Sequence, residues 1–141
     1  MWPDPVERIA AFVRASGAQG RLEQLPADAD GPPGPAVRAV GFDCNGRPLV
    51  ALVLEERAVD RDKLASAAGC STLVPTPPPF FPFQPARVFV DQTVLATDVV
   101  WLEAGSPQHV LGLAPSQLLS LTRAQTADLV LPGDVGDKPA G

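Results

Sequence analysis

The stretch VRAVGFDCNGRPLVALVLEE, residues 37–56, constrains the fold of this chain more than any other. It reads as two strands joined at Asn45-Gly46, a dipeptide suited to the positive φ angles of a tight hairpin turn. The second strand is a continuous apolar run, and such a run is typical of a strand inside a sheet. We therefore expect an antiparallel pair whose second strand lies centrally in a sheet.

Three other segments carry the start and stop signals of helices. Apolar residues recur at helical spacing in the first of them, DPVERIAAFVRASG. The expected helices span residues 4–17, 60–69 and 115–122. Asp4 and Asp60 are the expected N-caps, Pro115 opens the third helix, and Gly17 and Gly69 are the expected C-terminal stops. Further strands are expected over residues 20–26, 71–75, 87–91, 98–104 and 108–113.

The order of these elements predicts the fold class. Strands come in pairs with helices interspersed and without regular strand–helix alternation, which indicates an α+β domain built on a mixed sheet. A chain of 141 residues with 45% hydrophobic content can bury one substantial core. We expect a single domain over residues 1–127 and a frayed, flexible tail over residues 128–141.

Composition excludes several classes of function. The sequence has no stretch of about 18 apolar residues and no basic-then-apolar start, so we expect no membrane association and a cytoplasmic location. Cys44 and Cys70 lack metal-ligand spacing, and in a reducing compartment we expect both to be ordinary unpaired side chains. With a single histidine and no carboxylate cluster, no metal site is expected.

The net charge of −5 argues against tight, autonomous binding to long nucleic acid, including DNA. It leaves open a site that grips one nucleotide end.

Two segments suit loops. ADADGPPGPA, residues 27–36, is too rich in proline and glycine for regular structure. PTPPPFFPFQPA, residues 75–86, holds six prolines and three phenylalanines, which predicts a rigid, extended loop. Its rings Phe80, Phe81 and Phe83 suit either a lid over the core or a surface on which a base or an apolar side chain stacks.

A Gly-Ser-Pro turn over residues 105–107 interrupts an otherwise apolar region. It is either a plain strand connection or a site where backbone amides and the Ser106 hydroxyl stabilise an oxyanion, with Gly105 allowing close approach of a substrate. Ser106 and His109 should point to opposite faces in extended structure, which argues against a nucleophile–base pair. We expect His109 at the surface or against a partner, Trp101 in the core, and Asp91 and Asp98 as turn caps.

Three stretches together resemble the YbaK/ProX family, the aminoacyl-tRNA deacylases related to the editing domain of prolyl-tRNA synthetases. They are GFDCNGRPLVALVLEERAVDRDKLASAAG, RVFVDQTVL and VVWLEAGSPQHVLGLAPSQLLSLT. The resemblance implies a single α+β domain with a mixed, mainly antiparallel, barrel-like sheet surrounded by helices. It implies hydrolysis of the ester of mischarged tRNA without metal or cofactor, with the aminoacyl-tRNA 3′ end as substrate and a synthetase as a possible partner.

The resemblance also suggests site residues. Arg38 stands at the position of the family's characteristic lysine, and Gly105 and Ser106 would line the attack site. Phe42, Phe81, Phe83, Pro107 and His109 would contact the substrate.

Three departures from the family pattern keep other functions open. Arginine replaces the lysine, Pro78 and Pro79 replace a glycine pair, and the loop at residues 31–35 replaces a helix, which should leave the pocket wall reduced or open there. The alternatives are a catalytically inactive module that binds aminoacyl-tRNA, a nucleotide or a synthetase, and a hydrolase of another small ester.

Overall fold

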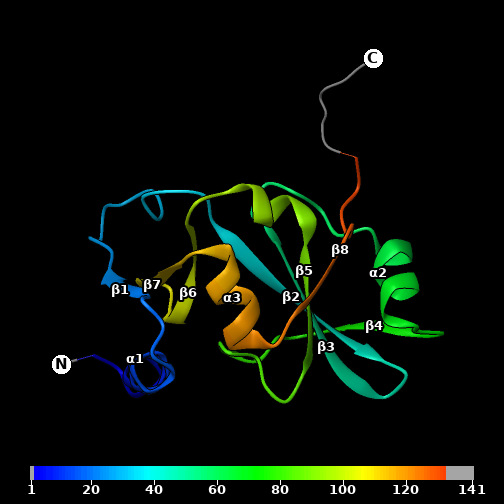
Figure 1. Ribbon diagram of the computed structural model, residues 1–141, viewed down its shortest axis with the longest axis horizontal. Coiled ribbons are helices and arrows are strands. Elements are labelled where there is room, and N and C mark those ends of the chain that lie inside the picture. Colours follow the sequence, from blue (N-terminus) through cyan, green and yellow to red (C-terminus); the bar gives the residue numbers. More distant parts are fainter. Residues whose placement is uncertain (1, 133–141) are drawn as a thin grey trace.

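The strands form two sheets that meet near the centre of the molecule (Figure 1). The computed structural model describes residues 2–132. In chain order the elements are α1 (Asp4–Ser16), β1 (Arg21–Gln24), β2 (Val37–Cys44), β3 (Arg47–Leu54), α2 (Arg61–Ala68), β4 (Leu73–Thr76), β5 (Arg87–Asp91), the 3₁₀ helix η1 (Gln92–Ala96), β6 (Val100–Ser106), β7 (His109–Leu113), α3 (Pro115–Thr122) and β8 (Gln125–Ala127). This is the expected single-domain α+β fold with a mixed sheet. Among the described residues, no helix is both long enough and apolar enough to span a bilayer.

The hairpin prediction is confirmed. Asn45 and Gly46 have φ angles of 53° and 86°, and β2 pairs antiparallel with β3 from Val37–Leu54 to Cys44–Arg47. The larger sheet has the order β4-β2-β3-β5-β8, which places β3 at its centre, as its apolar run predicts. β3–β5 and β5–β8 are parallel pairs, so the sheet is mixed.

The smaller sheet, β1-β7-β6, is antiparallel throughout. It touches the larger sheet where β2 begins: the Trp101 amide donates to the Pro35 carbonyl at 2.9 Å, and Ala36 bridges to Trp101 in parallel fashion. The two sheets are therefore continuous at this corner.

Each face of the larger sheet buries its own apolar cluster. One cluster lies between the two sheets and includes residues of α1, α3 and the proline-rich loop. The other lies under α2 and is closed by the chain after β8. Because strand side chains alternate, β2 sends Val37 and Ala39 to the first cluster and Val40 and Phe42 to the second.

The helix ends follow the sequence signals with one exception. Gly17 and Gly69 end α1 and α2 in the left-handed conformation, and Asp60 accepts hydrogen bonds from the amides of Asp62 and Lys63. The expected cap at Asp4 is wrong: Pro3 is the N-cap and its carbonyl accepts from the Glu7 amide. Asp4 is instead the first helical residue.

The chain remains packed beyond residue 127, where a flexible tail was expected to begin. Leu129 is fully buried, its carbonyl accepts from the Asp60 amide at 2.8 Å, and its amide donates to Asp91 at 2.8 Å. The expectation is wrong for residues 128–132 because Leu129 completes the cluster under α2. The rest of the expected tail, residues 133–141, lies outside the described residues.

Lys63 of α2 also holds this segment. Its ammonium lies 2.9 Å from Asp128, and this hydrogen bond holds the pKa of the Asp128 carboxyl below its ordinary value. The pair is exposed to solvent, so we assign it a positioning role and no large share of stability.

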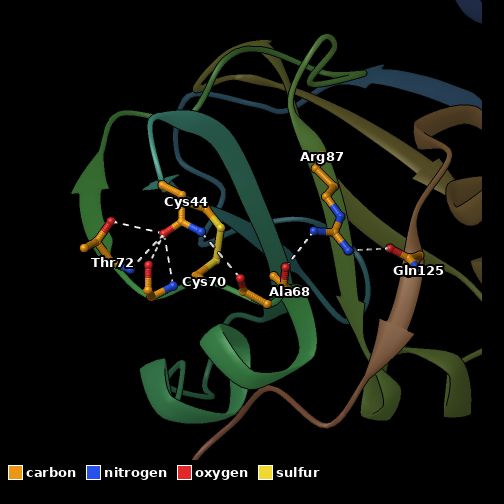
Figure 2. Close-up of a disulfide and its surroundings, with 9 residues drawn as sticks. Cys44, Ala68, Cys70, Thr72, Arg87 and Gln125 are labelled. Atoms are coloured by element: carbon orange, nitrogen blue, oxygen red, sulfur yellow. Dashed lines mark hydrogen bonds between the residues drawn. A yellow bond between two sulfur atoms is a disulfide. The ribbon is translucent and has the colours of Figure 1, made fainter.

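The expectation of two unpaired cysteines is wrong, because the structure joins Cys44 to Cys70 in a disulfide (Figure 2). The Asn45 side-chain oxygen accepts from the amides of Ser71 and Thr72 at 3.0 and 2.9 Å. This contact brings the chain after α2 against the hairpin and leaves the two cysteine Cα atoms 5.4 Å apart. Sequence spacing alone could not reveal that convergence.

Reduction of the disulfide should lower the free energy of unfolding. The bond closes a loop with a sequence separation of 26 residues, and loop-closure entropy predicts a loss of about 3–4 kcal/mol. Chemical denaturation with and without reductant measures the change. The double variant Cys44→Ser/Cys70→Ser should unfold identically in both conditions, and a wild type insensitive to reductant would contradict the prediction.

Asp91 should be a second determinant of stability. Its buried carboxylate accepts from the amides of Thr93 and Leu129, so it caps η1 as expected and also anchors the segment after β8. Asp91→Ala leaves these donors without a partner and should cost about 2–3 kcal/mol. Asp98→Ala, at an exposed position beyond the same 3₁₀ helix, should change the unfolding free energy by less than about 0.5 kcal/mol; equal effects would remove the special role of Asp91.

Candidate functional site

A cavity of about 380 Å³ lies at the corner where the two sheets meet. Its walls come from the loop after β1, the start of β2, the end of β3, the proline-rich loop and the hairpin β6–β7. The apolar lining residues include Leu25, Pro32, Ala39, Leu52, Phe81, Phe83, Trp101, Leu102 and Val110. Sites for small ligands have volumes of about 300–1,000 Å³ and mostly apolar walls, so this cavity has the dimensions of a binding site.

The proline-rich loop supplies one wall. Phe81 and Phe83 are each 4% exposed, with ring centroids 5.7 Å apart in an edge-to-face arrangement. Both rings belong to the hydrophobic core and also line the cavity. They therefore cover the core and form one wall of the cavity at the same time. Phe80 also lines the cavity, but it is 63% exposed.

Trp101 has a larger place in the site than the sequence suggested. It is buried, as expected, and it also lines the cavity. Its register partner on β7 is Gly112, where an added Cβ would lie 2.8 Å from the indole. A glycine opposite a tryptophan in paired strands was the signal that could have indicated a ring lying flat across the sheet.

The loop before β2 forms part of the wall where a reduced or open wall was expected. Leu25, Gly31, Pro32 and Ala36 all line the cavity. The prolines and glycines of this segment thus form the expected loop, and this irregular chain lies over the corner of the sheets.

Arg38 lines the cavity at the start of β2, and its guanidinium donates to the Arg57 carbonyl at 2.7 Å. Strand alternation starts its side chain on the face that carries Val40 and Phe42. A guanidinium has five N–H donors, so one hydrogen bond to a carbonyl leaves others for a ligand.

Two carboxylates accompany this arginine. Glu55 and Glu103 line the same cavity, and both are exposed to solvent. The charges at the site are therefore mixed, which suits a ligand that carries an ammonium group as well as a polar or anionic one.

Gly105 lies against the start of α1, whereas the sequence suggested that a substrate approaches it. Its φ angle is 94°, and an added Cβ would lie 2.8 Å from the Val6 nitrogen and 2.9 Å from the Pro5 carbonyl carbon. The missing side chain thus lets β6 pass the start of α1. Pro107 lines the cavity, whereas Gly105 and Ser106 are not among its lining residues.

The expectation that Ser106 and His109 point apart is wrong. The Ser106 hydroxyl lies 2.7 Å from His109 Nδ1, because a two-residue turn makes these residues partners across the hairpin. His109 is 4% exposed and packs edge-to-face with Trp2 at 5.4 Å, so the expected surface position is also wrong. Neither residue lines the cavity. Their contact, together with the hydrogen bond from the Gln108 amide to the Ser106 hydroxyl at 3.1 Å, holds the turn that carries Pro107.

Phe42 lies apart from the cavity. It is buried under α2 in the second cluster, with the Arg61 guanidinium 5.8 Å from its ring centroid. The structure therefore brings Arg38, Phe81, Phe83 and Pro107 to one cavity and places Phe42, Gly105, Ser106 and His109 elsewhere. Within residues 2–132, no group of three His, Cys, Asp or Glu side chains could hold a metal ion.

No protein-family model and no curated protein matches the sequence. Solved structures do match in fold. A proposed trans-editing enzyme for prolyl-tRNA synthetase superposes with a TM-score of 0.80 at 21% identity, covering 93% of this chain and 99% of that one.

Two other structures are similar. A scaffold protein from the computational grafting of linear epitopes gives a TM-score of 0.81 at 20% identity over 94% of this chain and 100% of that one. A hypothetical protein gives 0.76 at 15% identity over 88% and 99%. These likenesses establish that the chain shares its fold with these structures, including the proposed trans-editing enzyme.

The contact between Gly105 and α1 predicts the effect of a substitution. An alanine with a positive φ angle costs about 1–2 kcal/mol by itself. Gly105→Ala should lower the free energy of unfolding by clearly more than this, because the alanine Cβ would also clash with the α1 backbone. Gly17→Ala is the matched control, since Gly17 has a φ of 78° with nothing within 4 Å of an added Cβ. Equal losses in thermal or chemical denaturation would show that the contact with α1 is unimportant.

Proposed function

We propose that this protein is an aminoacyl-tRNA deacylase that acts in trans on the ester of mischarged tRNA. The observation that carries the proposal is the apolar cavity lined by Arg38 at the corner of a fold shared with a proposed trans-editing enzyme. The resemblance of residues 41–69, 87–95 and 99–122 to aminoacyl-tRNA deacylases supports the same activity.

The cavity lining fits the parts of an aminoacyl ester. Leu52, Phe81 and Trp101 offer an apolar surface to the amino-acid side chain. The carboxylates of Glu55 and Glu103 suit its free α-ammonium group. The unused donors of Arg38 suit the ester carbonyl or the terminal phosphate. Its side chain starts on the face of β2 opposite Ala39, so the guanidinium would have to reach the cavity around the edge of β2, which β4 leaves unpaired before Gly41.

The chemistry is the addition of water to the acyl carbon. The new C–O bond creates a tetrahedral oxyanion, and the bond to the ribose oxygen then breaks, with a proton passing from water to that oxygen. Arg38 would stabilise the oxyanion or hold the phosphate beside it. A neighbouring ribose hydroxyl of the substrate would orient the water, which requires no serine–histidine nucleophile.

The partners are the 3′ end of aminoacyl-tRNA and, as a further possibility, a synthetase. With a net charge of −5 the protein should bind tRNA weakly by itself and through few phosphate contacts. Delivery by a synthetase would compensate for that weak affinity.

A second candidate function is binding without hydrolysis. One specific observation favours it: the Arg38 guanidinium already donates to the Arg57 carbonyl, as a structural side chain would. In that case the cavity binds the aminoacyl-adenosine end and releases it unchanged.

Substitution of Arg38 separates the two functions. In a deacylation panel of charged tRNAs, with and without cognate synthetase, Arg38→Ala should lower the rate about 30-fold, or about 2 kcal/mol, because a charged hydrogen bond is lost in the transition state. Arg38→Lys should keep most of the activity, and Arg47→Ala, at the far end of the same hairpin, should match the wild type. Inactivity of the wild type on every charged tRNA would favour binding alone, and equal rates in all four proteins would exclude Arg38 from the site.

A further inference from the structure

A second, smaller hollow adjoins the cavity between α1 and the proline-rich loop. It has a volume of about 300 Å³, and its walls include Arg8 and Phe12 of α1 and Phe80, Phe81 and Pro82 of the loop. We call it the α1 groove. Phe80 and Phe81 line both the α1 groove and the cavity, so the two volumes share a wall.

The shared wall ends in an exposed aromatic ring. Phe80 is 63% exposed, whereas the adjacent Phe81 is 4% exposed and packs its ring 6.0 Å from that of Phe12. Phe12 itself is 36% exposed. An aromatic ring held at the mouth of a cavity by a proline-rich segment has little conformational freedom to lose, so it is suited to stack against a flat ligand.

The charge of the α1 groove differs from that of the cavity. Among its described lining residues, Arg8 is the one that carries a charge, whereas the cavity has Glu55 and Glu103 beside Arg38. In a protein with a net charge of −5, a groove with only a positive side chain among its walls is complementary to an anion.

We propose that the α1 groove binds the penultimate nucleotide of a single-stranded RNA 3′ end, with its base stacked on Phe80 and its phosphate near Arg8. This proposal rests on the proposed function, in which the terminal aminoacyl-adenosine occupies the cavity. The nucleotide that precedes the terminal adenosine must then lie outside the cavity. Phe80 separates the cavity from the α1 groove, so a strand that passes over Phe80 places this nucleotide in the groove, beside Arg8. A base stacks on any aromatic face, so the contact needs no base-specific hydrogen bond.

The test compares two esters of the same amino acid, a charged tRNA and an aminoacyl-adenosine that lacks the penultimate nucleotide. The measured quantity is the ratio of kcat/KM for the tRNA to kcat/KM for the adenosine ester. Phe80→Ala should lower this ratio about ten-fold, the scale of one lost base–aromatic stack. Phe80→Leu should lower it similarly, whereas Phe80→Trp should preserve it, because stacking requires a ring.

Arg8 supplies an independent measurement. Arg8→Gln should reduce the slope of log affinity against log salt for a CCA trinucleotide by about 0.7, the contribution of one phosphate contact on a single strand. Arg14→Gln is the matched control, since Arg14 is an exposed arginine of α1 that does not line the groove. Equal slopes for the two variants would overturn the phosphate contact.

Three results would overturn the proposal as a whole. An unchanged ratio in Phe80→Ala would exclude stacking of the penultimate nucleotide. Equal effects of Phe80→Leu and Phe80→Trp would indicate apolar contact without stacking. Concentration-dependent dimerisation that Phe80→Ala abolishes would assign the groove to a second copy of the chain.

Failure of the proposed function gives a different result. If the wild type hydrolyses neither ester, the deacylase is excluded, and fluorescence titration with the CCA trinucleotide then tests the groove alone. Binding that is about ten-fold weaker in Phe80→Ala, and unchanged in Leu95→Ala at an exposed apolar position elsewhere, would support the groove without catalysis. Absence of trinucleotide binding by the wild type would overturn both proposals.

Discussion

Burial of β3 on both faces is the constraint on which the rest of the structure depends. The side chains of Leu49 to Val53 are at most 1% exposed, so each face of this strand must be covered by other elements. The smaller sheet, α1 and α3 cover one face, and α2 with the chain after β8 covers the other. The disulfide and Asp91 hold the second covering in place because each joins it to the sheet by a specific bond.

The candidate site lies where the smaller sheet, α1 and α3 do not fully cover the larger sheet. The smaller sheet meets β2 at the bridge between Ala36 and Trp101, and beyond this corner only irregular chain is available to close the gap. Proline-rich segments suit that position because they lose little conformational entropy when ordered and because proline has no backbone N–H group that needs a hydrogen-bond acceptor. The same rigidity holds Phe81 and Phe83 toward the core and Phe80 toward solvent.

Predictions from local sequence signals were accurate where the signal and its cause lie within a few residues. The Asn45-Gly46 turn, the central position of β3 and the glycine ends of α1 and α2 are all confirmed. Predictions about which residues meet in space were less accurate. Periodicity places Ser106 and His109 on opposite faces of an extended strand, but the turn at Pro107 reverses the chain between them and brings the two side chains together.

The sequence by itself determined the α+β class, the loop that carries the aromatic wall and the elements other than η1 and β8, because turn chemistry, capping and apolar spacing act over short distances. Only the tertiary structure decided the pairing of Cys44 with Cys70, the contact of Gly105 with α1 and the docking of Leu129. Each of these depends on the packing of segments far apart in the chain. The cavity that unites Arg38, Trp101 and Phe81 has the same origin, since its walls come from four separate stretches of the chain that meet only when the two sheets do.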